Sequence, residues 1–419
     1  MTKKDSVLVI GAGAAGLGAA RVLQQVGWDV QILEARARIG GRIWTTEVGG
    51  VAVEAGAEFI HGPGAVTHDL LKAAGLIAEP IQRGEHLWWA EPGEAARRDL
   101  APELKQEFQN LWAIYEQLGQ SVLDRDGSFA DYFKTRGWAE KALERAEVLL
   151  AQPCCAPLDA LSCQDHIQEM QVDRAGSGDF RIVQGYRALL KWLSQDLTIH
   201  LNTCVHRIQW GSEGVQVWAG EQSFAAQACI LTVPVSILKA ERISFDPPLS
   251  PTRTTAVRSF HTEAATKLIY SFSTPVWPED LVYLAHLGLT ARWWSVPRQP
   301  ILVCFVTAER ARRLDALSEA QACAQGLQDL STLLDVSLSQ LQSCCTGCLR
   351  VSWARDPYAL GGYAHLPPHT AHSRKILAQP EAGVLFFAGE ATAFDSNPQT
   401  VHGAIESGYR AARECLAIH

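Results

Sequence analysis

The stretch that decides the fold is residues 7–20, VLVIGAGAAGLGAA, close to the amino end of the chain. The continuous apolar run of residues 7–10, bounded by glycine, predicts a strand that is buried on both faces in a parallel sheet. Gly11, Gly13 and Gly16 follow in Gly-x-Gly-x-x-Gly spacing: the first permits a tight turn, the second lets backbone approach a pyrophosphate, and the third lets a helix pack on the strand. We therefore predict a strand, a turn and a helix whose first N–H groups face phosphate oxygens.

A second strand is predicted at residues 30–33, and it ends at Glu34. Glu34 lies 18 residues after Gly16, where an acidic side chain can accept hydrogen bonds from the adenosine ribose of a dinucleotide. An acid at this position favours a free ribose hydroxyl over a 2′-phosphate. A glycine-rich turn alone can bind nothing, but here the strand, the helix and the acid occur together. The amino end therefore predicts a Rossmann-like, dinucleotide-binding unit.

Residues 384–414, VLFFAGEATAFDSNPQTVHGAIESGYRAARE, are the complement of this unit near the other end of the chain. Their pattern predicts a strand, a tight turn at Gly389 and Glu390, and a helix that begins beside Thr400 and Val401. We expect both ends of the chain to contribute to a single cofactor site.

Residues 34–45, EARARIGGRIWT, resemble the second flavin signature of the flavin-dependent amine oxidases, in which a Gly-Gly-Arg turn lies against the pyrophosphate of FAD. Arginines near a diphosphate make charge-assisted hydrogen bonds, although a solvated basic turn is the alternative for such a run. At the two amino-terminal turns the resemblance implies FAD contacts from Gly11, Gly13, Ala15, Gly16, Glu34, Ala35, Arg36, Gly41 and Arg42.

The resemblance continues along nearly the whole chain, in residues 51–62, 200–210, 228–238 and 384–414. A helix that begins beside the flavin carbonyl would stabilise negative charge on a reduced flavin. The further FAD contacts implied are Gly56, Ala57 and Glu58 beneath the flavin ring, Val205 at the adenine, Gly389 and Glu390 at the phosphates and ribityl chain, and Thr400 and Val401 beside the flavin carbonyl.

The fold class implied is α/β: a two-domain flavin amine oxidase-type fold with a Rossmann-like FAD domain and an α+β substrate domain that has a mixed sheet and helices. The chain has 419 residues, more than the roughly 100 to 200 of an ordinary domain, so two domains are expected. We predict a discontinuous FAD domain from residues 1–80, 196–240 and 378–419, and a substrate domain from 81–195 and 241–377, with the loop 83–96 at a crossing between them.

Within the substrate domain, residues 101–150 are predicted to be helical, because apolar residues recur there at helical spacing. The residues of this stripe are expected in the core: Leu104, Phe108, Leu111, Trp112, Tyr115 and Leu118. Residues 265–278 and 299–309 are rich in β-branched and aromatic residues and predict strands.

Charge and composition exclude some classes of function. The formal charge is −8 and the pI is about 5.9, which gives no basic footprint for nucleic acid and favours a cationic ligand. The first predicted strand follows Met1 closely and no apolar run reaches the roughly 18 residues of a membrane span, so we expect a cytoplasmic protein with no membrane partner.

The chain has 11 cysteines, which we expect to be reduced thiols in such a compartment. Cys344, Cys345 and Cys348 have metal-like spacing, but a tetrahedral site usually needs a second pair, and Cys154-Cys155 does not supply that spacing. We therefore expect free cysteines and no metal site, and the role of the Cys344, Cys345 and Cys348 cluster stays open.

Lys267 lies in an otherwise apolar predicted strand, which is a costly place for an ammonium group that has no partners. From the sequence alone, a lysine that protects an edge strand is an equal alternative. Lys267 matches the family lysine that holds a water against flavin N5, so the resemblance implies that role.

Trp353, Tyr358 and Tyr363 recur every five residues in residues 352–368, SWARDPYALGGYAHLPP. This spacing fits neither one helical face nor one strand face, although ordinary packing of three aromatics is the alternative. In the amine oxidases the matching aromatics wall the substrate cavity around the flavin, and Tyr363 matches one plate of an aromatic cage. Aromatic faces can attract and orient an amine.

The sequence departs from the monoamine oxidases at two positions. Thr400 stands where those enzymes place the second cage tyrosine, as in animal-type polyamine oxidases and lysine-specific histone demethylases. Gly362 stands where they carry the cysteine that bonds the flavin, so we predict noncovalent FAD.

Three further residues are candidates for contact with substrate. His61 matches a histidine that faces the substrate in polyamine oxidases, and a simple turn residue is the alternative. Glu58 and Glu169 are possible anchors for a second ammonium, although Glu169 rests on charge alone.

Taken with the resemblance, these residues imply an enzyme that oxidises a C–N bond of a polyamine such as spermine or spermidine, by hydride transfer to flavin N5, imine hydrolysis and reoxidation by O2 to give H2O2. The alternatives left open are an L-amino-acid or other primary-amine oxidase, a carotenoid-type FAD desaturase and a non-catalytic flavoprotein. An amino-acid oxidase ranks lower, because residues 56–62, GAEFIHG, contain no arginine for a carboxylate. The bond cleaved, the oligomeric state and the physiological electron acceptor stay open.

Overall fold

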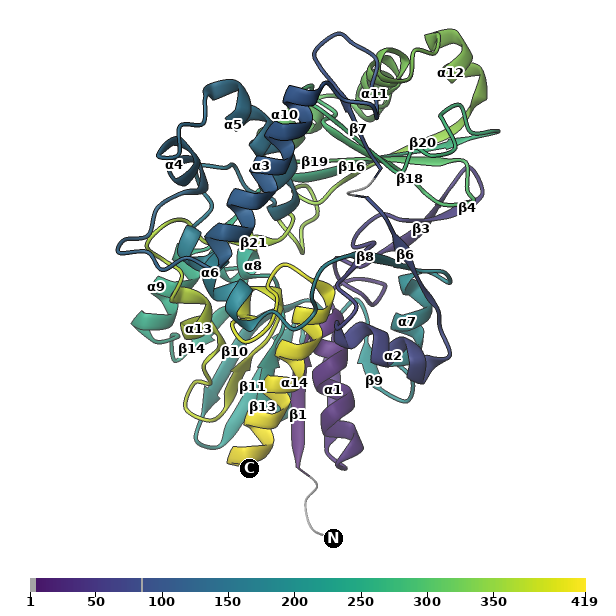
Figure 1. Cartoon of the computed structure of the whole chain (residues 1–419). Coiled ribbons are helices and arrows are strands. Elements are labelled where there is room, and N and C mark those ends of the chain that lie inside the picture. The colour runs from purple at the N-terminus through teal and green to yellow at the C-terminus, as the bar shows by residue number, and fades with distance from the viewer. Residues whose placement is uncertain (1–4, 84–85) are drawn as a thin grey trace.

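A five-stranded parallel sheet forms the centre of the lower half of the molecule in Figure 1, a computed structural model that describes residues 5–83 and 86–419. The expectation of a cytoplasmic protein depends in part on residues 1–4, and the predicted crossing loop includes residues 84–85, so both predictions lie partly outside the described residues. In order across the sheet the strands are β22 (Leu385–Phe387), β13 (Ala228–Leu231), β1 (Ser6–Ile10), β2 (Asp29–Leu33) and β9 (Thr198–His200). The strands predicted at residues 7–10 and 30–33 are therefore confirmed.

Two helices from opposite ends of the chain pack side by side on this sheet (Figure 1). They are α1 (Ala14–Gln25) and α14 (Val401–Ile418). Leu17, Leu23 and Ile405 are fully buried in the core between them and the sheet. The helices α2 (Val66–Ala74) and α7 (Tyr186–Leu193) complete this core.

A second, four-stranded sheet packs against the same strands. Its order is β12 (Gln222–Ala226), β11 (Gly214–Ala219), β10 (Val205–Gly211) and β14 (Ser244–Asp246). Val205 and Val217 share a core with Leu8 and Ile10 of β1, so the start of β10 lies against the dinucleotide sheet. The elements around it are α8 (Val235–Lys239), α9 (Pro251–Ser259), α13 (Ser373–Ala378) and the pair β15 (His261–Thr262) and β21 (Ala364–His365).

A six-stranded mixed sheet forms the upper half of the molecule in Figure 1. Only β7 runs parallel to its neighbour among the described pairs. The order is β20 (Cys345–Ser352), β16 (Ala265–Phe272), β19 (Ile301–Thr307), β18 (Arg292–Ser295), β17 (Tyr283–His286) and β7 (Leu87–Ala90). The strands predicted at residues 265–278 and 299–309 are confirmed as β16 and β19.

Helices surround this upper sheet, and the predicted helical segment 101–150 is several elements rather than one. Of its apolar residues, Phe108, Leu111 and Leu118 are buried, whereas Trp112 is 42% exposed and was wrongly expected in the core. The helices are α3 (Pro102–Gly119), α4 (Phe129–Lys134), α5 (Glu140–Ala146), the short η1 (Glu147–Ala151) and η2 (Gln152–Cys154), α6 (Cys163–Val172), α10 (Ala308–Ala316), α11 (Glu319–Leu334) and α12 (Leu338–Cys344).

The chain passes between the two halves more often than the predicted boundaries allow. The strand β8 (Asp179–Ile182) pairs with β5 (Ile60–His61) and β6 (Ala78–Ile81), and α7 belongs to the core of the parallel sheet. The hairpin of β3 (Thr45–Val48) and β4 (Val51–Glu54) instead buries valines in the core of the upper sheet. These boundaries differ because side-chain contacts across the sheets, rather than local composition, decide where each segment packs.

One pair of cysteines contradicts the expectation of reduced thiols throughout. Cys323 of α11 and Cys348 of β20 form a disulfide, with Cα atoms 6.3 Å apart, while Cys344 and Cys345 are free. The expected cluster is therefore divided, and Cys348 joins the edge strand of the upper sheet to a covering helix. Within residues 5–83 and 86–419, no helix is both long and apolar enough to cross a membrane.

Candidate active site

A cavity of about 750 Å³ lies between the two halves of the molecule. Gly11, Glu34 and Val205 line it from the parallel-sheet half, and Lys267 and Trp294 line it from the upper sheet. Every site residue predicted from the sequence lines this cavity except Gly16. Segments that are hundreds of residues apart in the chain therefore meet at one place.

The first turn of the dinucleotide motif explains why Gly16 matters without lining the cavity. A Cβ atom at Gly16 would lie 1.9 Å from the Gly11 carbonyl oxygen, so only glycine lets α1 pack this closely on the turn. The amino end of α1 receives no side-chain cap from any described residue, and Gly13, Ala14 and Ala15 line the cavity there. Its free N–H groups fit phosphate oxygens.

Glu34 is held in a fixed orientation at the end of β2. Its Oε2 accepts a hydrogen bond from the backbone N–H of Ala12 at 2.8 Å, and its Oε1 accepts one from that of Arg36 at 2.9 Å. The residue is only 3% exposed. A buried carboxylate that is already oriented by backbone fits recognition of ribose hydroxyls.

Tyr358 lies beside this adenosine end of the cavity. The Arg36 guanidinium is 5.2 Å from the centre of the Tyr358 ring, and it pairs with Asp356 at 2.5 Å and with Glu34 at 3.9 Å. The expectation that Tyr358 walls the substrate cavity together with Trp353 and Tyr363 does not fit these contacts. Tyr358 instead lies next to Arg36, an arginine of the predicted dinucleotide site.

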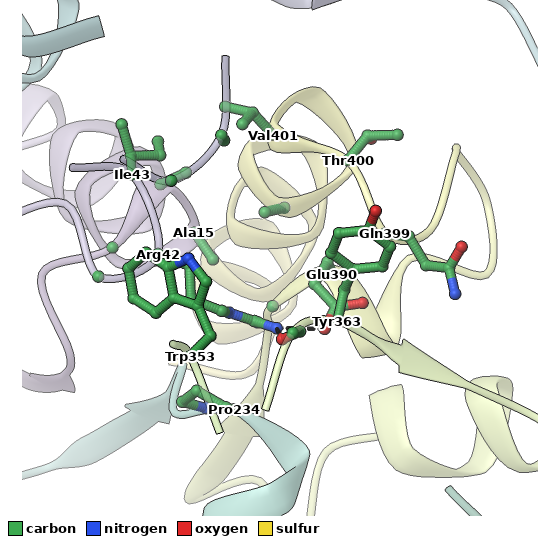
Figure 2. A pocket seen from close by; sticks show the side chains of 18 of the residues that line it. Ala15, Arg42, Ile43, Pro234, Trp353, Tyr363, Glu390, Gln399, Thr400 and Val401 are labelled. Atoms are coloured by element: carbon green, nitrogen blue, oxygen red, sulfur yellow. Dashed lines mark hydrogen bonds and ion pairs between the residues drawn. The ribbon is translucent and has the colours of Figure 1, made fainter. Parts of the chain in front are cut away.

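Arg42 and Glu390 join the second flavin signature to the carboxyl-terminal turn. Arg42 Nη1 donates to Glu390 Oε1 at 3.0 Å and to the Gly362 carbonyl, and Figure 2 shows this contact close to Trp353 and Tyr363. Glu390 Oε2 is buried and has no hydrogen-bond partner among the described residues. Buried carboxylate oxygens are normally paired, so this atom fits a cofactor hydroxyl as donor. Three features therefore make the cavity suited to FAD: the uncapped amino end of α1, the oriented Glu34 carboxylate and the unpaired Glu390 Oε2.

Lys267 lies in the middle of the upper sheet, since β16 is flanked by β20 and β19. The edge-strand alternative is therefore wrong. Its Nζ donates to the carbonyl oxygens of Glu54 at 2.9 Å and Gly56 at 2.8 Å, and to Glu58 Oε2 at 2.9 Å. An ammonium group has three N–H donors, so holding a water, as the resemblance implies, would require one of these bonds to open.

Glu58 is the internal counter-ion of this cluster. Its Oε1 accepts from Arg181 at 2.6 Å and from the Trp294 indole at 3.0 Å, while Oε2 pairs with Lys267. Burial acts to raise the pKa of Glu58, but the charges of Lys267 and Arg181 outweigh it and hold that pKa below its usual value. With both oxygens engaged, Glu58 does not fit the possible role of anchor for a substrate ammonium.

Trp353 and Tyr363 present aromatic faces to the cavity, and hydrogen bonds at their polar ends fix them. The Trp353 indole donates to the Ala55 carbonyl at 3.3 Å, and the Tyr363 hydroxyl donates to the Pro153 carbonyl at 2.5 Å. Burial raises the pKa of Tyr363, so its hydroxyl remains a donor. Thr400 opposite them is the N-cap of α14: its Oγ1 accepts from the N–H of Gly403 at 2.9 Å.

His61 lies at the solvent-facing side of the cavity, with 48% of its side chain exposed. Its Nδ1 is 2.6 Å from Asp179 Oδ1, and Arg83 binds the other oxygen of Asp179. Burial acts to raise the pKa of Asp179, but the His61 hydrogen bond and the Arg83 charge hold it at about 2. Asp179 thus orients the ring and leaves Nε2 for a ligand.

Glu169 and several residues that the sequence did not single out complete the wall beyond the aromatic pair. Burial, with the neighbouring charge of Asp165, raises the pKa of Glu169 to about 7. Arg292, like Lys267, is a cation in an apolar strand, and this pattern in the sequence could have identified it as a site residue. The residues not predicted are Phe59, Arg83, Tyr115, Cys154, Arg292, Trp294, Phe305, Asn397, Gln399 and His402.

The surroundings of Gly362 support the prediction of noncovalent FAD. A Cβ at Gly362 would lie 2.6 Å from Cys155 Sγ, and Cys154 and Cys204 are the only cysteines among the described residues that line the cavity. Burial is the main cause that raises the pKa of the Cys154 thiol to about 12, which keeps it protonated and unreactive. We expect acid-denatured protein to release all its flavin into the supernatant. Flavin that stays with the precipitated polypeptide would contradict this.

Comparisons with known proteins relate the whole chain to one family. The profile of the family described as flavin containing amine oxidoreductase matches residues 14–416. The chain is 28% identical to polyamine oxidase 4 of Oryza sativa subsp. japonica, over 98% of this chain and 88% of that protein. It is also 28% identical to lysine-specific histone demethylase 1 homolog 2 of Arabidopsis thaliana, over 99% of this chain but 59% of the demethylase homolog.

Solved structures show the same fold. A putrescine oxidase bound to putrescine has a TM-score of 0.83 at 22% identity, covering 99% of each chain. Cyclohexylamine oxidase from Brevibacterium oxydans has a TM-score of 0.84 at 20% identity, again covering 99% of each chain. The fold predicted from the sequence is thus confirmed, and with FAD as its cofactor this enzyme belongs to the flavin containing amine oxidoreductase family.

Proposed function

We propose that this enzyme oxidises a C–N bond of a di- or polyamine and returns the electrons to O2 as H2O2. The observation that carries the proposal is Glu169, a carboxyl group in the wall of the same cavity that contains the flavin cradle and the aromatic pair Trp353 and Tyr363. A substrate with two amines can place one near the flavin and the other, as an ammonium, at Glu169. The relative named polyamine oxidase 4 and the fold of putrescine oxidase point in the same direction.

The protein contributes orientation and charge to this chemistry. Bound FAD would supply the hydride acceptor for oxidation of the amine at its α-carbon, and water would hydrolyse the resulting substrate iminium. Trp353 and Tyr363 orient the reacting amine between aromatic faces and exclude water from it, which favours its neutral, reactive form. Lys267 fixes the Gly56 backbone on which the flavin ring is expected to lie.

The test is anaerobic mixing of the purified yellow protein with amines while flavin absorbance is followed. We expect putrescine or spermidine to bleach the flavin faster than tyramine, which lacks a second ammonium. Bleaching by L-phenylalanine alone would favour an amino-acid oxidase, bleaching by a carotenoid precursor alone would favour a desaturase, and no bleaching by any compound would favour a non-catalytic flavoprotein.

The substitution Glu169→Gln tests the anchor. We expect it to raise KM for spermidine by about 10-fold, because a charge-assisted hydrogen bond is lost, and to change tyramine oxidation less than twofold. Since the carboxyl group ionises as pH rises through about 7, kcat/KM for spermidine should rise there in the wild type, and this rise should be absent from the variant. An exposed glutamate, Glu213→Gln, is the matched control. Equal losses of kcat/KM for spermidine and tyramine in Glu169→Gln would contradict the role of Glu169 as an ammonium anchor.

A further inference from the structure

Arg292 is a buried cation in the wall of the active-site cavity. It begins β18 and is 5% exposed, and its Nε donates to the Tyr283 hydroxyl at 2.6 Å. Nη1 is buried without a hydrogen-bond partner, and Arg292 forms no ion pair with any described residue. Other buried arginines among the described residues, such as Arg145, Arg253 and Arg374, pair with a carboxylate.

An unpaired guanidinium in such a place is costly, because a buried charge loses its hydration and needs an anion or several acceptors in return. The aromatic rings of Tyr283 and Phe305 lie 5.7 and 5.9 Å from the guanidinium carbon and provide only weak compensation. None of the described residues supplies that partner. Because Arg292 lines the cavity, a ligand of the cavity can reach its guanidinium.

The position of Arg292 relates it to the reacting centre. Trp294 is two residues further along β18 and faces the same side, about 7 Å away along the strand. The Trp294 ring is 5.3 Å from Lys267 Nζ. Lys267 pairs with Phe305 of β19, and the register that pairs Trp293 with Cys304 brings Arg292 to the other side of Phe305, so Arg292 lies two strands from Lys267 on the same face of the sheet. The charge of Arg292 also acts to lower the pKa of Tyr363, against the larger effect of burial, which places it near that aromatic ring.

Arg292 and Glu169 give the far wall two opposite charges. Both charges act on the thiol of Cys154. Burial is the largest cause that raises the pKa of this thiol; the charge of Glu169 raises it further and the charge of Arg292 lowers it. A simple diamine would satisfy Glu169 and leave Arg292 unpaired. A ligand that carries a carboxylate in addition to its amines would satisfy both.

We propose that Arg292 binds a carboxylate of the substrate, so that the amine oxidised in this cavity is a di- or polyamine that also carries a carboxylate. This inference rests on the proposed amine oxidation and adds a specificity-determining residue to it. A guanidinium binds a carboxylate through two parallel N–H donors, which neither an amine nor a single acyl oxygen can match. The arginine that the sequence lacks after Gly56 is thus supplied from another strand.

Matched substrates test the proposal in the wild-type enzyme. L-ornithine is putrescine with one added carboxylate, and L-lysine is cadaverine with one added carboxylate; N-acetylputrescine has a neutral acyl oxygen instead. We expect kcat/KM to be about 10- to 100-fold higher for at least one carboxylated member than for its diamine, the range for a charge-assisted pair. If every diamine or N-acetylputrescine is preferred, the carboxylate assignment is overturned while amine oxidation stands.

Variants of Arg292 provide the second readout. Arg292→Met should remove the preference for the carboxylated amine and leave kcat/KM for the diamine within about threefold of the wild-type value. Arg292→Lys should keep part of this preference, because the positive charge remains. Arg207→Met, at an exposed position outside the cavity, is the control. FAD content and the unfolding midpoint show whether each variant is folded. If folded Arg292→Met lost kcat/KM equally for a carboxylated amine and its diamine, the proposal would be overturned. If no amine bleached the flavin of the wild-type enzyme, the proposed function itself would be contradicted.

Discussion

Replacing Lys267 by methionine is expected to lower flavin reduction by about 100-fold and the free energy of unfolding by about 3 kcal/mol. The rate falls because Nζ holds the Glu54 and Gly56 carbonyls, and a displacement of about 1 Å at a reacting centre can cost about 100-fold. Stability falls because a buried ion pair loses one partner, while Arg181 still compensates part of the Glu58 charge. Stopped-flow absorbance and urea unfolding measure the two effects.

A pH dependence and a double variant separate the two effects of Lys267→Met. In the wild type the pKa of Glu58 is lowered, so its ionised form adds stability above its unfolded pKa of about 4.3. Without Lys267, the effect of burial, which acts to raise that pKa, is opposed by Arg181 and Trp294 alone, and less of this stability remains. The difference in stability should therefore widen as pH rises from 5 to 8. Lys267→Met combined with Glu58→Gln should recover part of the stability but not the rate. Recovery of both would show that Lys267 acts on structure alone, and an unchanged rate in Lys267→Met would contradict its placement at the reacting centre.

Replacing Gly16 by alanine is expected to weaken FAD binding by about 10- to 100-fold. The new Cβ would lie 1.9 Å from the Gly11 oxygen, so either the turn or α1 must move, and overpacking of this kind costs about 1 to 3 kcal/mol. The displacement falls on the turn that carries the phosphate-binding N–H groups. Equilibrium dialysis of the apoprotein with FAD measures the change.

Gly18→Ala, two residues along the same helix, is the matched control. Its Cβ would meet the Ile405 oxygen at 3.3 Å, a contact that a small shift relieves, and Gly18 does not line the cavity. We expect its FAD affinity to stay within about twofold of the wild type. If Gly16→Ala bound FAD as tightly as Gly18→Ala, the close packing of helix on turn would not matter for the cofactor.

Features set by local spacing were predictable from the sequence. The strand, glycine turn and Glu34 follow one another within 28 residues, and the turn at Gly389 carries its own pattern. Lys267 was identifiable because an ammonium in an apolar strand demands partners. The structure places all of these at one cavity, although their individual roles remain predictions.

Features set by long-range contact were not predictable. The partners of Lys267 lie more than 200 residues away in the chain, and nothing local to Glu58 shows that Lys267 and Arg181 neutralise it. The pairing of Cys348 with Cys323 depends on α11 crossing the edge strand β20. Tyr358 was expected on the substrate wall because its spacing from Trp353 and Tyr363 is regular, whereas its ring lies beside Arg36.

The order of strands in the parallel sheet determines when during synthesis the enzyme can acquire its cofactor. β1 and β2 emerge first from the ribosome, yet β22 and α14, which close the sheet and the phosphate site, come last. Until residues 385–418 have been made, β13 remains an unpaired edge that can bind other chains. Loading with FAD is therefore a late event, and a nascent chain needs protection from aggregation at this edge from the synthesis of β13 until β22 has been made.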